Sequence, residues 1–312
     1  MRSVVVASAT MLCVGACAPD DAASEAVESR PFRIVVLADP HLPDPGYVGP
    51  EANDFDTASI LAAHERLLAA REAINAIEPA PDFVVILGDL LHSDYPYDTL
   101  EDYTTQPSAF SRAAEVLAGF DMPVRLVLGE GDYGLPEVPR EQTHALFEHF
   151  FGAAPYESFE HEGWKFILAN SQLGDTLDPT SEGYDPAKGS YGREQLDWIA
   201  GELFDRKPTV FLSHYPIPFE TAVFENLESP SRDIFTLMTE HVQTMKLGLA
   251  GHLHRWIDYR MVAPTDIYVL AGLRYDADNY WLIELDAASE SYEILDVDKV
   301  HWQTPEADGH GP

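Results

Sequence analysis

Short apolar runs alternate with segments of helical periodicity along most of the chain. Residues 33–38 form a β-branched apolar run, as expected for a strand buried on both faces of a sheet. Similar runs predict further strands at residues 82–87, 124–128, 164–169, 209–213, 246–250, 267–270 and 280–285. The first half of the chain therefore has βαβ character, and the last part is rich in strands.

The clearest helix is predicted between residues 57 and 74, where apolar side chains recur at three- and four-residue spacing. Asp56 and Thr57 are candidate caps for it, and Pro79 ends it. Weaker patterns predict helices near residues 108–118, 141–150, 193–204 and 231–242. No repeat or linker divides residues 31–300, so we expect one domain of two sheets with helices outside them.

The N-terminal residues have a different character. Arg2 precedes a short apolar stretch at residues 4–16, which is too short to span a bilayer and is typical of a signal peptide. Residues 14–17, Val-Gly-Ala-Cys, resemble a bacterial lipobox, in which the cysteine receives a lipid and becomes the mature N-terminus. We predict a signal peptide at residues 1–16, a lipidated Cys17 and a flexible acidic tether to residue 30. The protein would then be exported and anchored in the periplasm or cell envelope; an ordinary secretory signal with an incidental cysteine is the alternative.

Composition narrows the classes of function. The 312 residues include 53 acidic and 19 basic ones, giving a net charge of −34, and 46% are hydrophobic. The apolar share argues against intrinsic disorder, and the acidity argues against a nucleic-acid groove or an anionic-membrane patch. We expect contact with a membrane only through the lipid anchor. Both cysteines, Cys13 and Cys17, precede the domain, so it has no disulfide, and residues 301–312 form a C-terminal tail.

Several of the predicted strands end in potential metal ligands. Two aspartates and four histidines follow strands at residues 33–38, 82–87, 209–213 and 246–250: Asp39, His41, Asp89, His214, His252 and His254. Ligands just past strand ends suit a site at the carboxyl edge of a sheet. Carboxylates and imidazoles together bind Mn, Fe or Zn. At i, i+2 spacing in extended backbone, Asp39 with His41 and His252 with His254 would each project to one side. A single histidine at a strand end is ordinarily a surface residue, so it is the combination of these six residues that indicates a metal site.

In chain order, these motifs resemble those of the calcineurin-like metallophosphoesterases: Asp39-x-His41, Gly88-Asp89, Gly129-x-x-Asp132, His214 and Gly251-His252-x-His254. The resemblance extends over residues 32–298 and includes the helix at residues 192–199 and the strand end at Asn170-Ser171. It implies an α/β fold, a four-layer αββα sandwich of two mixed sheets flanked by helices, with the metals at one edge.

The resemblance also implies two divalent metal ions and a role for each ligand. It assigns Asp39, His41 and His254 to the first metal, His214 and His252 to the second, and Asp89 to a position bridging both. The implied reaction is hydrolysis of a phosphate ester by a hydroxide that bridges the metals. Ser213 beside His214 is a poor nucleophile–base pair, because adjacent strand residues face opposite ways.

One block departs from the family pattern. Gly129-Glu130-Gly131-Asp132 stands where the family has Gly-Asn-His-Asp or Gly-Asn-His-Glu. Glu130 can bind the second metal in place of the asparagine. Its negative charge, however, changes the charge of the site. Two divalent ions, a hydroxide and the carboxylates of Asp39, Asp89 and Glu130 sum to zero. We therefore expect weaker binding of phosphomonoester dianions and a preference for diesters.

Gly131 removes the histidine that contacts the phosphate or assists the leaving group in the family. His92, three residues after Asp89, is a candidate substitute acid, although a surface or capping histidine is the commoner role. Asp132 is a second catalytic candidate, and it acts either through the residues beside the metals or by hydrogen-bonding the turn.

Two functions remain open at this point. One is a metal-dependent hydrolase of a small phosphomonoester or phosphodiester; the alternative is a catalytically impaired protein of the same fold that binds metal or a phosphorylated ligand. Residues 90–106, 172–191 and 215–229 are candidate cleft walls. Tyr95, Tyr97 and Tyr103 in the first of them are candidates to stack on a base or sugar, although an exposed tyrosine among Asp and Pro is more often an ordinary loop residue. The sequence specifies neither the substrate nor the oligomeric state.

Overall fold

A computed structural model describes residues 30–49, 55–92, 95–185, 188–217, 233–258 and 265–295. The signal peptide, Cys17, the tether up to residue 29 and the C-terminal tail lie outside these described residues, so those predictions stay predictions. Most of the candidate cleft wall at residues 215–229 lies outside them too. Within the described ranges, no helix has the length and apolar character needed to cross a membrane.

The first sheet has five strands in the order β11-β10-β1-β2-β3. Its parallel part is β1 (Phe32–Leu37), β2 (Phe83–Leu87) and β3 (Val124–Val127). The strands β10 (Tyr280–Asp286) and β11 (Ser291–Ile294) come from the end of the domain, and β10 pairs antiparallel with β1. The N- and C-terminal parts of the domain thus share one mixed sheet.

The second sheet has six strands in the order β4-β5-β6-β7-β9-β8. Its parallel centre is formed by β5 (Trp164–Leu168), β6 (Thr209–Leu212), β7 (Met245–Ala250) and β9 (Asp266–Val269). The edge strands β4 (Glu157–His161) and β8 (Ile257–Asp258) are antiparallel to their neighbours. Both sheets are therefore mixed.

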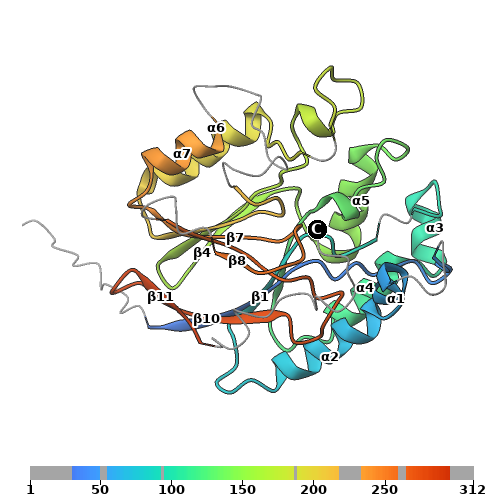
Figure 1. The fold of residues 1–312 in the computed structure, drawn as a ribbon, viewed down its shortest axis with the longest axis horizontal. Coiled ribbons are helices and arrows are strands. Elements are labelled where there is room, and N and C mark those ends of the chain that lie inside the picture. The colour runs from blue at the N-terminus through green and yellow to red at the C-terminus, as the bar shows by residue number, and fades with distance from the viewer. Residues whose placement is uncertain are drawn as a thin grey trace, which may run out of the picture.

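The two sheets lie face to face with helices on both outer sides (Figure 1). Helices α2 (Ala63–Asn75) and α4 (Ala109–Leu117) cover the first sheet, whereas α6 (Arg193–Glu202) and α7 (Ile234–Glu240) cover the second. The remaining helical elements are α1 (Phe55–Leu61), α3 (Leu100–Thr105), α5 (Arg140–Phe151) and the 3₁₀ turns η1 (Glu130–Asp132), η2 (Asp175–Leu177) and η3 (Leu203–Asp205).

Alternation along the strands explains the layers. On β1, Val35 and Leu37 pack under the helices, whereas Ile34 and Val36 pack between the sheets. A third apolar layer lies between the second sheet and its helices, and Phe211 on β6 belongs to it. Successive strand residues point to opposite faces, so a strand that is apolar throughout serves two layers. The αββα sandwich expected from the sequence is confirmed.

The observed elements differ from expectation in the first long helix and at the sheet edges. The helix predicted at residues 57–74 is divided at Ala62 into α1 and α2. Helix α2 ends at Asn75, before Pro79, and the Asn75 side chain donates to the Gly119 carbonyl and accepts from the Asp121 amide. The edge strands β4, β8 and β11 were not predicted, because they are short and carry polar residues.

Candidate metal centre

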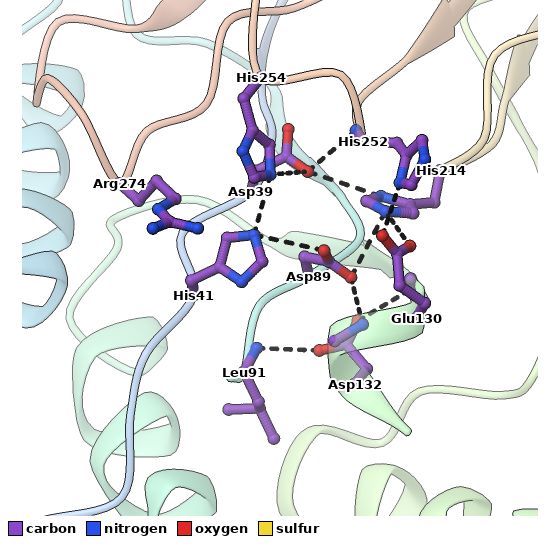
Figure 2. Close-up of polar contacts among 12 residues, drawn as sticks. Asp39, His41, Asp89, Leu91, Glu130, Asp132, His214, His252, His254 and Arg274 are labelled. Carbon is purple, nitrogen blue, oxygen red and sulfur yellow. Dashed lines mark hydrogen bonds and ion pairs between the residues drawn. The ribbon is translucent and has the colours of Figure 1, made fainter. Parts of the chain in front are cut away.

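The strands that carry the predicted ligands end at one edge of the sandwich. Asp39 and His41 follow β1, Asp89 follows β2 and Glu130 follows β3, all in the first sheet. The other ligands follow β6 and β7 of the second sheet, and Figure 2 shows all seven side chains converging. They form two groups: Asp39, His41, Asp89 and His254, and Glu130, His214 and His252.

The ligand atoms of each group lie within 4.8 Å of one another. In the first group, the Nε2 atoms of His41 and His254 are 3.0 Å apart, and His41 Nε2 is 3.3 Å from Asp89 Oδ2. In the second group, Glu130 Oε2 lies 2.6 Å from His214 Nε2. Asp89 Oδ1 is 3.4 Å from the same His214 nitrogen, so the Asp89 carboxylate lies between the two groups.

The backbone at these ligands is not extended, and the expectation that i, i+2 residues project together from extended chain is wrong. Asp39, His41, His252 and His254 have φ angles of 53°, 52°, 69° and 53°. Non-glycine residues adopt this left-handed region rarely, and they persist there only where the surroundings fix them. Tight turns at the strand ends, rather than pleating, therefore bring both members of each pair into the site.

Hydrogen bonds behind the ligands fix their orientation. His214 Nδ1 donates to the Leu87 carbonyl at 2.7 Å, which leaves Nε2 to face the site. The His252 amide donates to Asp39 Oδ1 at 2.9 Å, and the Gly131 amide donates to Asp89 Oδ1 at 2.6 Å. Backbone amides thus hold both aspartates in place.

Close packing behind His214 requires a glycine. Gly88 has a φ of +83°, and a Cβ atom there would lie 2.4 Å from His214 Nδ1. Only glycine combines this backbone conformation with so close an approach.

Burial and mutual charge shift the pKa values in the cluster. Burial, with the charges of Asp89 and Glu130, raises the pKa of Asp39 well above its usual value. Burial and the Arg274 charge lower the pKa of His254 to about 3. The pKa of His41 is likewise well below its usual value, first through burial and then through His254 and Arg274. His41 and His254 are therefore neutral and can offer lone pairs.

The second group shows the opposite balance. Burial lowers the pKa of His214, but the charges of Asp89 and Glu130 outweigh it and leave this pKa well above its usual value. Burial raises the pKa of Glu130, but His214 and His252 reverse that effect and hold it well below its usual range. The protons held by the second group occupy the positions that a metal ion would take, because a metal ion displaces protons from its ligands when it binds.

These residues fit two divalent cations. Asp39 Oδ2 is buried without a hydrogen-bond partner among the described residues. Three carboxylates and four imidazoles converge in two adjacent groups, a donor set that suits Mn, Fe or Zn. The donors do not distinguish among these metals.

The two catalytic candidates lie in different surroundings. Asp132 is fully buried, and its carboxylate accepts from the Leu91 amide at 2.9 Å and the Gly129 amide at 2.8 Å. Burial and the Asp89 charge raise its pKa to about 8. His92 is half-buried beside the first group, with its ring centroid 5.7 Å from that of His41. Asp132 thus braces the turn that carries Glu130, whereas His92 borders the ligands.

Gly131 is tightly enclosed. A Cβ atom at this position would lie 2.9 Å from the Leu91 carbonyl oxygen and 3.0 Å from Asp89 Oδ1. A histidine here would require the turn to move away from Asp89. The departure from the family pattern is therefore built into the shape of this turn.

Two sequence interpretations need revision. Tyr103 is 1% exposed in the core, and Tyr95 packs against the same cluster with its hydroxyl donating to the Asp132 carbonyl, so these two candidate rings face the core and not a substrate. Conversely, the sequence reasoning missed Arg274, whose guanidinium lies beside His41 and His254 (Figure 2). It follows the end of β9 by five residues, so the strand-end pattern that identified the ligands extends to it.

Comparisons with known proteins agree with this arrangement. Residues 32–256 match the family model described as calcineurin-like phosphoesterase. Serine/threonine-protein phosphatase CPPED1 of Bos taurus is 27% identical over 198 residues, covering 60% of this chain and 57% of that protein. A 3',5'-cyclic-nucleotide phosphodiesterase of Nostoc sp. is 24% identical over 235 residues, covering 73% of both. The chain therefore spans little more than half the length of the bovine relative. A solved dimetal phosphatase of Danio rerio covers 81% of this chain and 92% of its own at a TM-score of 0.55 and 14% identity, which shows a shared fold.

Proposed function

Because the chain belongs to the calcineurin-like phosphoesterase family, we propose that it hydrolyses phosphate esters with the help of two divalent metal ions. The observation that carries this proposal is the pair of adjacent ligand groups with the Asp89 carboxylate between them. The names of the relatives, a protein phosphatase and a cyclic-nucleotide phosphodiesterase, support a phosphomonoester or a phosphodiester as substrate, and we propose a small one.

In this proposal each group holds one metal ion. Asp39, His41 and His254 would hold the first, Glu130, His214 and His252 would hold the second, and Asp89 lies where it could contribute to either. Such a pair of ions activates a water for attack on phosphorus and neutralises the phosphate oxygens. The chain's own part is orientation: the Leu87 carbonyl fixes the tautomer of His214, and backbone amides hold Asp39 and Asp89.

His92 is our candidate for donating a proton to the leaving group. Its ring lies between His41 and Tyr47, with centroid distances of 5.7 and 5.2 Å. Burial and the Arg274 charge lower its pKa, so its protonated form is a stronger acid than an exposed histidine. Asp132 is proposed as a positioning residue, because both its oxygens accept backbone hydrogen bonds that hold the turn.

Glu130 sets the expected charge preference. With Glu130 in place of an asparagine, the metal ions and their anionic ligands have no net positive charge left for the substrate. A phosphodiester carries less negative charge than a phosphomonoester and is disfavoured less. We therefore propose that diesters are the better substrates.

The test compares hydrolysis of bis(p-nitrophenyl) phosphate and p-nitrophenyl phosphate by the full chain, with Mn²⁺ or Zn²⁺ and with chelator. Asp89→Asn should reduce metal-dependent turnover by about a hundredfold or more, whereas Asp121→Asn, on an exposed loop, should not change it. Two bound metal ions per chain without turnover of either ester would instead support the alternative, a protein of this fold that binds a phosphorylated ligand.

We also propose that the chain is exported and anchored through a lipid on Cys17. This rests on the lipobox-like residues 14–17 and the acidic tether after them. The anchor would hold the metal centre near a membrane surface without inserting the domain.

A further inference from the structure

Arg274 is a buried cation at the rim of the first ligand group. Its side chain is 7% exposed, and it follows Gly272 and Leu273, which run beside the β1 end. The Arg274 amide donates to the Asp39 carbonyl at 3.1 Å. The backbone that carries this arginine is therefore fixed to the backbone of a metal ligand.

The guanidinium is held from one side by α1. Its Nε and one Nη donate to Ser59 Oγ at 3.0 and 2.7 Å, and the same Nη contacts Asp56 Oδ1 at 3.0 Å. Its central carbon lies 4.9 Å from the centre of the Tyr275 ring. Because Ser59 and Asp56 engage Nε and one Nη, the arginine is held in place and its other Nη can donate to a phosphate at little cost in side-chain entropy.

Its charge faces the catalytic side. Figure 2 shows the guanidinium beside His41 and His254, across the cluster from Glu130. The partner carboxylate on Asp56 is 65% exposed, so water screens it more than it screens the buried arginine.

We propose that Arg274 binds a phosphate oxygen of the substrate beside the first metal group and supplies the positive charge that Glu130 removes. With Arg274 counted, the charge of the centre returns to the value that an asparagine at position 130 would give. Gly131 has no side chain to contact the phosphate, and a Cβ there would meet Leu91 and Asp89. Arg274 lies on the opposite side of the cluster, where its second Nη can donate to a phosphate oxygen. This inference rests on the proposed function, since it places a phosphate at the metal centre.

A purely structural role is the competing explanation, because Arg274 also joins the β9 end to α1. The two roles differ in what a lysine can replace. A lysine keeps the charge but loses the paired donors to Ser59, so it restores part of phosphate binding but little of the α1 contact. Ser59→Ala weakens the α1 contact and leaves the guanidinium charge in place.

The experiment measures the binding of inorganic phosphate to the Mn²⁺-loaded full chain by calorimetry, with metal content and melting temperature recorded for every variant. Arg274→Gln should weaken phosphate binding by about tenfold to a hundredfold, the loss expected for charge-assisted hydrogen bonds. Arg274→Lys should weaken it less. The matched control is Arg125→Gln, which removes the same charge at the start of β3, and it should change phosphate binding less than about twofold.

A second comparison tests the link to Glu130. Glu130→Asn should tighten phosphate binding, and Arg274→Gln added to it should return the affinity close to that of the unaltered protein. KM for p-nitrophenyl phosphate should follow the same order as the phosphate affinities.

The inference is overturned if Arg274→Gln binds phosphate as tightly as the unaltered protein does, or if the unaltered protein binds no phosphate. It is also overturned if Arg274→Gln, Arg274→Lys and Ser59→Ala weaken binding equally and lower the melting temperature together. Failure of the proposed function gives a different result: Arg274-dependent phosphate binding without any metal-dependent hydrolysis. Metal-dependent turnover together with phosphate binding that does not depend on Arg274 would contradict only the inference about Arg274.

Discussion

Replacing Glu130 by asparagine should shift the preference of the protein toward phosphomonoesters. The substitution removes one negative charge from the second ligand group and keeps an oxygen that can bind a metal ion. Glu130 pairs with His214 Nε2 at 2.6 Å and with His252 Nδ1 at 2.5 Å, so its carboxylate belongs to the site and not to bulk solvent.

The expected magnitude follows from Coulomb's law. At about 6 Å and an effective dielectric constant of about 20, two unit charges interact by about 3 kcal/mol. The Glu130 side chain is 31% exposed, and screening by water and salt reduces the effect to roughly 1–2 kcal/mol. A monoester dianion carries one charge more than a diester, so the ratio of monoester to diester kcat/KM should rise by about fivefold to thirtyfold.

The assay measures kcat/KM at pH 8 for p-nitrophenyl phosphate and bis(p-nitrophenyl) phosphate, with metal content determined in parallel. Glu130→Gln is a second neutral variant, of nearly unchanged size, and Glu240→Gln at the exposed end of α7 removes the same charge away from the ligands. The charge argument predicts the shift for both variants at position 130 and none for Glu240→Gln. An equal change for both esters, or a larger gain for the diester, would refute it.

Four further predictions concern other parts of the molecule. His92→Gln should lower kcat for alkyl phosphate esters by about tenfold or more and leave p-nitrophenyl esters nearly unchanged, because only poor leaving groups need a proton; equal losses would argue against a proton-donating role. Although burial lowers the pKa of His214, the carboxylates around it raise this pKa well above its usual value, so a metal must displace a proton. Metal affinity should therefore rise with pH and fall as the pH drops, and calorimetry in buffers of different ionisation enthalpy should detect the released proton; a pH-independent affinity would contradict this. Phe166→Ala, in the layer between the sheets, should lower the free energy of unfolding by about 3–5 kcal/mol, whereas Phe204→Ala, at an 84% exposed position, should change it by about 0.5 kcal/mol or less, as denaturant titration can show. Cys17→Ser should move the protein expressed in a bacterial host from the membrane fraction to the soluble fraction, and unchanged membrane recovery would exclude the lipid anchor.

The sequence predicted the layers well because the signal is local. A strand such as β1, which is apolar at successive positions, indicates burial on both faces, and helical periodicity between such strands indicates an outer layer. Which strands share a sheet depends on contacts between distant residues. The pairing of β10 with β1 joins the two ends of the domain, and no local pattern specifies it.

The same difference between local patterns and contacts of distant residues applies to the candidate site. Ligands could be proposed from the ends of β1, β2, β6 and β7, because parallel strands place their carboxyl ends at one edge. The left-handed conformation of Asp39 and His252 was not predictable, since local preference opposes it and tertiary contacts impose it. Arg274 was missed because its role depends on Ser59 and on the metal ligands, which are distant in sequence.

A Mn²⁺ titration of the chelator-treated full chain, with diester hydrolysis as the readout, tests the central claim most directly. The two ligand groups predict that turnover is absent without metal and rises to a plateau at two equivalents of Mn²⁺ per chain. Turnover that persists without metal, or two bound equivalents with no turnover, would contradict a dinuclear phosphoesterase.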